Sequence, residues 1–195
     1  KRLQNKEFCK QIEDLIQVGL WRYQDKFDRK QVTEGPFVLY EKYSRRDVSL
    51  LMNCGRDLSS IMYGMKRIGD DVFIFVTYHK VDAKSDELQY AEGKPDYADA
   101  FTDSMIFRWD SQIGKGPESS YMQDVTGAKR KHLLVKKSDA EASFYYMGTF
   151  DIISVVGDKK IDNRGNKKDI TKVTMKMHQA VREDLLKYLE SNLLD

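Results

Sequence analysis

The stretch FRWDSQ, residues 107–112, gathers more groups suited to a flat polar ligand than any other part of the chain. Its residues alternate in type, which predicts a β-strand with two different faces. The two sets of side chains are Phe107, Trp109 and Ser111 on one face, and Arg108, Asp110 and Gln112 on the other. Such groups can stack on a nucleic-acid base and pair with its edge. The alternative is an amphipathic edge strand with its aromatic residues in the core and its polar residues in water.

Length and composition indicate one domain with an appendage. The chain has 195 residues, of which 41% are hydrophobic and 33% charged, as in ordinary globular proteins. It contains neither an apolar run long enough for a membrane span nor a signal peptide. Because it begins KRLQNKEF without an initiator Met, we expect it to be a piece of a longer protein.

Cysteine and histidine usage favours a cytoplasmic protein without a metal or other cofactor. Cys9 and Cys54 are far apart and lack metal-ligand spacing, so two reduced thiols are expected. The three histidines are isolated in the sequence, which argues against a zinc site.

Charge is distributed unevenly along the chain. Residues 70–103 carry nine acidic and three basic side chains, whereas residues 40–69 carry six basic and three acidic ones. Residues 104–137 are again basic, with seven basic and three acidic side chains. If the fold gathers the two basic segments on one face, that face would suit a polyanion; the alternative is a solvated surface.

Local patterns predict the element order. Residues 5–18 have the spacing of an amphipathic helix that Gly19 ends or bends, with a second short helical piece following it. Gly35-Pro36 marks a boundary. We therefore expect a helical coupler over residues 1–33 and the main domain over residues 34–195.

The sequence SRRD, residues 44–47, predicts a capped helix. Ser44 and Asp47 fit a capping box, and the helix would end near Met52. Arg45 and Arg46 would lie on its first turn, either as phosphate contacts or as solvent-facing surface residues.

The remaining patterns predict an α+β fold. Strands are expected at 71–79, 107–112, 131–137, 143–156 with a bend at Gly148, and 169–177 with a local irregularity. A long acidic loop is expected at 82–99, a short helix near 120–125 and a last helix at 179–193. Without βαβ alternation, the sheet should be strongly bent and mostly antiparallel, closing toward a barrel flanked by helices.

Several kinds of catalytic site have no counterpart in the sequence. Residues 114–120, GKGPESS, lack the ending of a phosphate-binding loop, and no nucleophile-elbow pattern marks a serine. The carboxylates Asp70 and Asp71 precede a strand that lacks the second acid of a metal nuclease. We therefore expect a binding domain rather than an enzyme.

Five blocks, taken in order, resemble a known family. They are YEKYSRRDV (40–48), SSIMYG (59–64), IFVTYHK (74–80), FRWDSQ (107–112), and HLLVKKSD with FYYMG (132–148). Together they resemble the C-terminal domain, of unknown function, of bacterial helicase–nuclease restriction enzymes of the SauUSI type. The resemblance extends from about Phe37 to Leu189.

The resemblance implies an SRA-like (SRA/PUA-like) barrel that reads 5-methylcytosine in duplex DNA by flipping the base, inside an ATP-dependent, modification-dependent (type IV) restriction enzyme. Its partners would be double-stranded DNA containing modified cytosine and the helicase and nuclease domains of the parent chain. The candidate pocket residues are Trp109, Ser111, Gln112, Asp110, Asp103, Tyr78, Tyr43 and Tyr146. The candidate DNA-backbone contacts are Arg45, Arg46, Arg108, Lys115, Ser119, Ser120, Lys136 and Lys137. Alternatives are a protein-interaction module that regulates the helicase without touching DNA, and a small catalytic domain.

Overall fold

The computed structural model describes residues 5–27, 35–79, 99–162 and 164–191. The chain forms two compact units, residues 1–39 and residues 40–195. The boundary predicted between residues 33 and 34 falls outside the described residues, and so does nearly all of the acidic loop predicted at 82–99.

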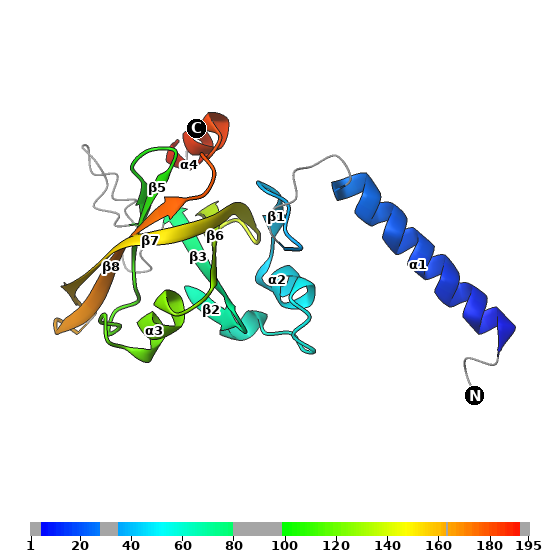
Figure 1. Ribbon diagram of the computed structural model, residues 1–195, viewed down its shortest axis with the longest axis horizontal. Helices are drawn as coiled ribbons and strands as arrows, with labels where there is room; N and C mark the ends of the chain where they lie inside the picture. Colours follow the sequence, from blue (N-terminus) through cyan, green and yellow to red (C-terminus); the bar gives the residue numbers. More distant parts are fainter. Residues whose placement is uncertain (1–4, 28–34, 80–98, 163, 192–195) are drawn as a thin grey trace. The chain divides into compact units, whose positions relative to one another are not determined.

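The first unit contains one long helix, α1 (Lys6–Phe27), shown in blue in Figure 1. The side-chain oxygen of Asn5 accepts hydrogen bonds from the backbone N–H groups of Glu7 and Phe8 and so caps the helix. Gly19 does not end the helix, and the second helical piece predicted after it is part of α1, which continues to Phe27. A glycine inside a helix costs only about 1 kcal/mol relative to alanine, which the neighbouring turns can offset.

The second unit is built on an eight-stranded sheet in the order β2-β3-β6-β7-β8-β5-β4, with β1 paired to β7 beside this path (Figure 1). The strands are β1 (Lys42–Tyr43), β2 (Met65–Ile68), β3 (Asp71–His79), β4 (Ala100–Phe101), β5 (Ile106–Asp110), β6 (Arg130–Ser138), β7 (Phe144–Ile161) and β8 (Lys167–Met177). The pair β3–β6 is parallel, and the other described pairs are antiparallel. The predicted α+β class and the mostly antiparallel sheet are confirmed.

Strand β7 belongs to both halves of this sheet. It pairs with β6 along its first part and with β8 along the rest. Leu133 pairs with Gly148 while Leu134 pairs with Tyr146, so β7 carries one extra residue at this point. Gly148 has φ +99°, and the predicted bend at this residue is confirmed as a β-bulge.

A second bulge in β7 explains the irregularity predicted for the strand at 169–177. Ile152 pairs with Met175 and Ser154 with Thr174, which leaves Ile153 as the extra residue. The sequence had placed the irregularity in β8, but the extra residue lies in its partner strand, β7. Each bulge bends the strand and increases its twist, so β7 can continue from one half of the sheet into the other.

The helices of the second unit are α2 (Arg45–Leu51), a short 3-10 helix η2 (Ser59–Ile61), α3 (Ser120–Thr126) and α4 (Glu183–Glu190). The predicted capping box is present, since Ser44 and Asp47 bond each other's backbone N–H groups. The last helix begins four residues later than predicted. The N–H of Val181 donates to Ser104 O at 2.8 Å, and this tertiary bond replaces a bond within the helix just before α4.

The main core lies between the two halves of the sheet and under α3 and α4. Its members are apolar side chains from the strands and from α3 and α4, including Ile74, Val76, Phe107, Trp109, Met122, Leu133, Val135, Met147, Met175 and Leu189. The opposite face of β3, β6 and β7 carries a second buried layer in which Tyr43 packs edge-on against Tyr146, and Phe75 against Phe144.

The predicted closure into a barrel is wrong. The end strands β2 and β4 are not paired with each other in the described part of the chain, so the sheet is open. Beyond β5 the chain stays beside β8, because the N–H of Ser111 donates to Thr171 O at 2.8 Å. A side chain spans the opening instead: Gln112 Nε2 donates to Tyr63 O, just before β2, at 2.9 Å.

We expect Gly148→Ala to destabilise the domain by about 1–3 kcal/mol, because alanine rarely adopts the positive φ that this bulge requires. The free energy of unfolding in urea measures the effect. Gly19→Ala is a matched control, because it removes a glycine whose added Cβ would meet nothing within 4 Å. Equal stability of Gly148→Ala and the parent would contradict the bulge geometry.

Candidate functional site

Strand β5 presents its two faces as the alternation predicts. Phe107 and Trp109 are buried in the core, while Arg108 is exposed. The aromatic side chains of FRWDSQ therefore pack as in the amphipathic-strand alternative. The polar groups that remain available lie where β5 ends.

Ser111 is occupied by hydrogen bonds within the domain. Its hydroxyl donates to Lys115 O at 2.7 Å and accepts from the N–H of Thr171 at 2.8 Å. The Thr171 hydroxyl also donates to Lys115 O. The side chain of Ser111 therefore ties the loop after β5 to β8, and replacing it would disturb this loop.

Gln112 is exposed, and its carboxamide joins the end of β5 to the entrance of β2. The close approach depends on Gly64, which has φ +71°. A Cβ on Gly64 would lie 2.8 Å from Gln112 Nε2 and 3.2 Å from the hydroxyl oxygen of Tyr121. The two side chains thus meet at one glycine, with the carboxamide oxygen of Gln112 left to accept a bond.

Tyr121, in the first turn of α3, has a buried hydroxyl with no hydrogen-bond partner among the described residues. Its ring stacks on Trp109 with centroids 6.3 Å apart, and Lys115 Nζ lies 5.8 Å from the ring centroid. Burial, followed by the charge of Asp99, raises the pKa of Tyr121, so the phenol keeps its proton at neutral pH. An unpartnered buried donor is costly, and a ligand acceptor would relieve that cost.

Two carboxylates lie at this end of β5. Asp99 Oδ1 accepts a hydrogen bond from the N–H of Asp110 at 2.8 Å, which fixes the Asp99 side chain beside β5. Asp110 Oδ2 lies 2.8 Å from Lys160 Nζ of β7. Asp110 is therefore held in an ion pair, whereas Asp99 is the acid whose charge acts on Tyr121.

These residues form what we call the β5-end cluster: Asp99, Trp109, Asp110, Gln112, Lys115 and Tyr121. The cluster combines an aromatic pair, a neutral hydroxyl donor, carboxylate and carboxamide acceptors, and a cation. Such groups recognise a flat polar ligand by stacking and edge hydrogen bonds. The arrangement can therefore bind such a ligand.

Five of the predicted pocket residues lie outside this cluster, and one of them is Ser111, whose hydroxyl is bonded to the loop after β5 and to β8. Tyr43 and Tyr146 are in the second buried layer, on the opposite face of the sheet. Tyr78 is a buried core residue. Asp103 is exposed, and its carboxylate accepts from the N–H groups of Met105 and Ile106 in the turn between β4 and β5.

The two arginines of α2 differ in their surroundings. The guanidinium of Arg45 lies over the rings of Tyr63 and Phe144, at 5.3 and 5.2 Å from their centroids. Arg46 is exposed and lies 3.6 Å from a carboxylate oxygen of Asp57. Arg46 can reach a phosphate from its present position, whereas Arg45 would first have to leave its contacts with the aromatic rings.

The other predicted backbone contacts also separate into two groups. Lys136 is only 8% exposed and donates to Glu141 O, and Lys137 donates to the hydroxyl of Ser191. Ser119 caps α3 by accepting from the N–H of Met122. Arg108 and Ser120 are exposed, and Lys115 is half-buried at the β5-end cluster.

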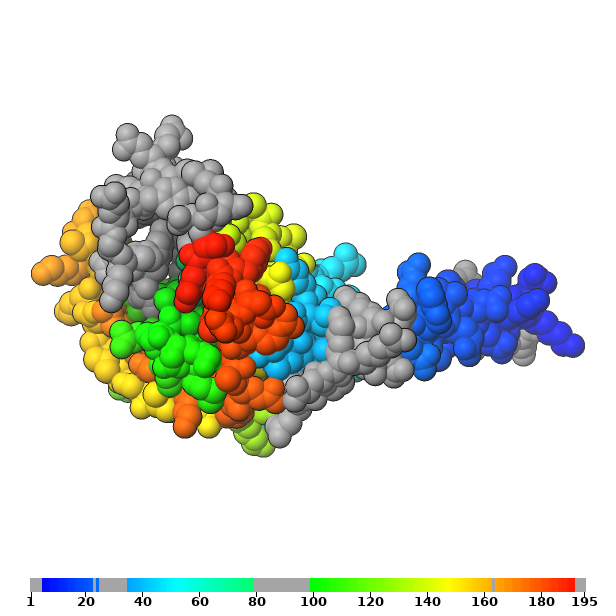
Figure 2. All heavy atoms as spheres, turned by 90° about the horizontal axis from the view of Figure 1, so that it is seen from above, coloured from blue at the N-terminus to red at the C-terminus, as the bar shows by residue number. Residues whose placement is uncertain are grey.

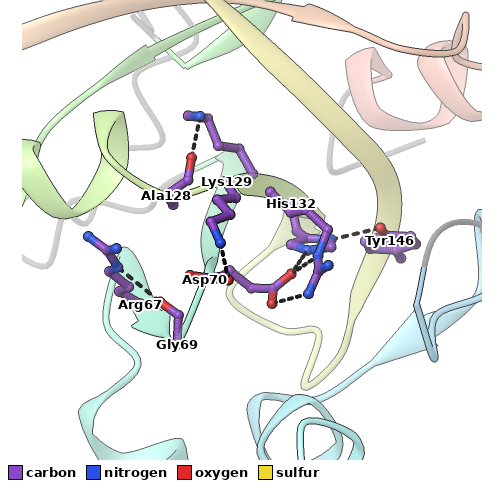
Figure 3. Close-up of polar contacts among 10 residues, drawn as sticks. Arg67, Gly69, Asp70, Ala128, Lys129, His132 and Tyr146 are labelled. Atoms are coloured by element: carbon purple, nitrogen blue, oxygen red, sulfur yellow. Dashed lines mark hydrogen bonds and ion pairs between the residues drawn. The ribbon is translucent and has the colours of Figure 1, made fainter.

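A second polar network lies inside the sheet, as Figure 3 shows around His132 and Tyr146. Asp71 accepts two hydrogen bonds from Arg130, at 2.6 and 2.7 Å. His132 Nε2 lies 2.7 Å from Asp71 Oδ1, and His132 Nδ1 lies 2.9 Å from the hydroxyl of Tyr146. The ring of Phe73 stacks on His132, with centroids 4.5 Å apart.

This network resembles a catalytic relay in composition, but its burial gives it a structural role. Tyr146 is 0%, His132 1% and Asp71 4% exposed, so no substrate can reach them in this conformation. Burial lowers the pKa of His132, although the Asp71 carboxylate opposes this shift. Burial would raise the pKa of Asp71, but hydrogen bonds from Arg130 and His132 outweigh it and hold that pKa below its usual value.

Sequence reasoning missed Tyr121, Asp99 and Gly64. Tyr121 sits on a short helix whose spacing predicts only core contacts, and Asp99 ends the predicted acidic loop. No local pattern distinguishes either from an ordinary packing or surface residue. They become a site because α3 packs against the end of β5, and the sequence does not display that contact.

The described residues contain no group of three or more His, Cys, Asp and Glu side chains placed to hold a metal ion. Over the same part of the chain, no helix has both the length and the apolar character needed to cross a membrane.

Comparison with protein families finds one family model that matches most of the second unit. Residues 37–189 match the model of a domain of unknown function, DUF3427. The chain belongs to this family. The match covers the extent predicted from the five sequence blocks, Phe37 to Leu189, and confirms the resemblance at the level of a domain of unknown function. No curated protein matches the chain.

Solved structures show weak likenesses to this DUF3427 chain. Arabidopsis thaliana SUVH6 in complex with SAM aligns with TM-score 0.47 and 10% identity, over 88% of this chain and 32% of that one. The sulfur-binding and SRA domains of ScoMcrA, complexed with phosphorothioated DNA, align with TM-score 0.43 and 8% identity, over 82% and 47%. The MspJI restriction endonuclease in complex with a 27-mer oligonucleotide aligns with TM-score 0.37 and 9% identity, over 58% of this chain and 31% of that one. The chain spans less than half of each, and likenesses at this level carry no conclusion about its function.

The His132 network predicts a pH dependence of stability. Because the pKa of His132 is lower in the folded state than its ordinary value of about 6.5, the unfolded chain binds more protons as the pH falls. The stability that neutral His132 contributes is therefore present above about pH 6.5 and is lost as the pH falls through the folded pKa. Urea unfolding should show a lower free energy at pH 5.5 than at pH 7.5.

The variant His132→Gln should flatten this dependence, since glutamine does not titrate in this range. If the parent and the variant lose the same free energy of unfolding over this pH interval, the pH dependence arises from groups other than His132.

Proposed function

We propose that this DUF3427 domain recognises 5-methylcytosine in duplex DNA and holds the flipped base at the β5-end cluster. The observation that carries the proposal is the buried hydroxyl of Tyr121, which lacks a described partner and stacks on Trp109 beside an acidic and an amide side chain. A site built for a ligand leaves such a donor unsatisfied until the ligand arrives.

The cluster offers complementary groups for the edge of a cytosine. The Asp99 carboxylate or the oxygen of Gln112 can accept from the exocyclic amino group, and the phenol of Tyr121 can donate to a ring acceptor. Aromatic stacking is worth about 1–3 kcal/mol per base, which offsets an extrusion cost of a few kcal/mol. A site that holds a flipped base can contact both its methyl group and its pairing edge. A contact in the major groove reaches the methyl group but not the pairing edge.

Exposed cations would supply binding that does not depend on sequence. Arg46 and Arg108 are exposed, and Lys115 lies at the cluster itself. Phosphate contacts of this kind position a protein on the duplex, while base contacts discriminate.

The wider context follows from the resemblance of the sequence blocks, which family membership over residues 37–189 supports. In this proposal the domain has an SRA-like fold and belongs to a cytoplasmic, SauUSI-type, type IV restriction enzyme. The helicase and nuclease domains of that enzyme would cut DNA, and this domain would select the target without catalysis.

A protein-interaction module is the second candidate, and α1 favours it. The helix exposes large apolar side chains, among them Leu15 and Trp21. These residues belong to the first unit, so a protein contact there is compatible with DNA reading by the second unit. The experiment below separates the two functions.

The first test compares a short duplex that carries one 5-methylcytosine with the same unmodified duplex. We expect tighter binding to the methylated duplex, without cleavage, in fluorescence anisotropy titrations over a range of salt concentrations. Equal affinities at physiological salt would remove the reading function, and the interaction module would then be favoured.

The second test uses two substitutions that each remove one hydroxyl. Tyr121→Phe should lower the preference for methylated DNA by about 1–3 kcal/mol, the usual value of one base-edge interaction. It should leave the unfolding free energy unchanged or slightly higher, because that hydroxyl has no described partner.

The matched variant Tyr146→Phe should behave in the opposite way. Its hydroxyl bonds His132, so the change should cost about 1–3 kcal/mol of stability and leave the preference unaltered. If Tyr121→Phe keeps the full preference, the base is not held at this cluster.

A further inference from the structure

The distal part of β7 and β8 forms a two-stranded ribbon that projects from the domain. We define the β7–β8 ribbon as residues 153–162 and 164–170, drawn in yellow to orange in Figure 1. Its strands are paired without a break from Asp158 opposite Ile170 to Ile161 opposite Lys167. In Figure 2 the yellow to orange atoms of this segment lie at the margin of the domain. Continuous pairing makes the ribbon a stiff arm rather than a loose loop.

The ribbon exposes apolar side chains that a solvated arm would not need. Ile153 is 55%, Val156 55% and Ile161 65% exposed. Antiparallel strands that face water normally alternate between apolar and polar residues. Apolar residues exposed on a projecting element indicate a surface that meets a partner.

The sign of the charge identifies the partner. Residues 159–168 carry five basic side chains and one acidic side chain, Asp162. The Asp162 carboxylate accepts from the N–H groups of Arg164 and Asn166, both at 2.9 Å. The single acid is therefore committed to the backbone of the tip, and the charge that the tip presents outward is positive.

The cations of the ribbon fall into two sets. On β7, Lys160 pairs with Asp110 at 2.8 Å, and Lys159 Nζ lies 3.8 Å from Asp169 Oδ1. At the tip, Arg164, Lys167 and Lys168 form no ion pair with any described residue. Three exposed cations at the end of a stiff arm are placed to meet an anionic surface.

We infer that the β7–β8 ribbon is a second DNA contact, which lies along the duplex and binds its phosphates through Arg164, Lys167 and Lys168. The choice of DNA as the partner rests on the proposed function. The major groove of B-DNA, about 12 Å wide, admits a two-stranded β-ribbon, so the apolar side chains can enter the groove while the cations reach its walls. The Lys160–Asp110 ion pair links this arm to the β5-end cluster.

The test is the double variant Arg164→Ala/Lys168→Ala in the full chain, titrated against the methylated and the unmodified duplex. Both affinities should fall by the same factor, so that their ratio is retained. The slope of log affinity against log salt should become shallower by about two units, roughly one for each lost phosphate contact.

The control is Lys129→Ala/Lys187→Ala, which removes the same net charge elsewhere. Both lysines are exposed and pair with carboxylates, Lys129 with Asp70 and Lys187 with Glu183. This variant should keep the salt slope of the parent. Melting curves establish that both variants are folded, as expected for surface substitutions.

Each other outcome has a defined meaning. Unchanged affinity and slope in the ribbon variant, or an equal loss in the control, would overturn the inference. A parent that dimerises through the ribbon, with DNA binding unaffected by the variant, would replace DNA with a second copy of the chain. If the parent shows no preference for methylated DNA while the slope still falls, the ribbon contact stands and the base-reading function fails.

Discussion

The architecture depends on the backbone hydrogen bonds of one strand, β7, which pairs with β6 and then with β8. A single strand can serve both halves only if it bends, and two extra residues in β7 provide the bends. Each half of the sheet then buries one face against the other, so the main core exists because β7 is continuous. The same strand extends beyond the core as one side of the β7–β8 ribbon.

Because the sheet remains open, its two ends can hold a site. In a closed barrel, backbone bonds would join β2 to its neighbour across the gap. Here the carboxamide of Gln112 makes the connection at Gly64, with the Tyr121 hydroxyl close by. The β5-end cluster and the His132 network illustrate two uses of buried polar groups. The network satisfies the hydrogen bonds of its members, whereas the phenol in the cluster has no hydrogen-bond partner among the described residues.

The cations of the second unit are placed in two different ways. Some cations pair with nearby acids or lie over aromatic rings, as Lys160 and Arg45 do. At the tip of the ribbon the only acid is bound to the backbone, so positive charge is left for an external partner. In the proposed function, the first arrangement serves discrimination and the second serves position on the duplex.

The amino-acid sequence by itself determined the local elements: the capped helix at Ser44, the buried strand at 71–79, the bend at Gly148 and the family blocks from Phe37 to Leu189. Capping, alternation and glycine conformation act over a few residues, so they can be recognised in order along the chain. Only the tertiary structure decided that the sheet stays open, that Tyr121 reaches the end of β5, and that Lys136 is used internally. These outcomes depend on contacts between residues far apart in the sequence, and no local pattern records which distant groups will meet.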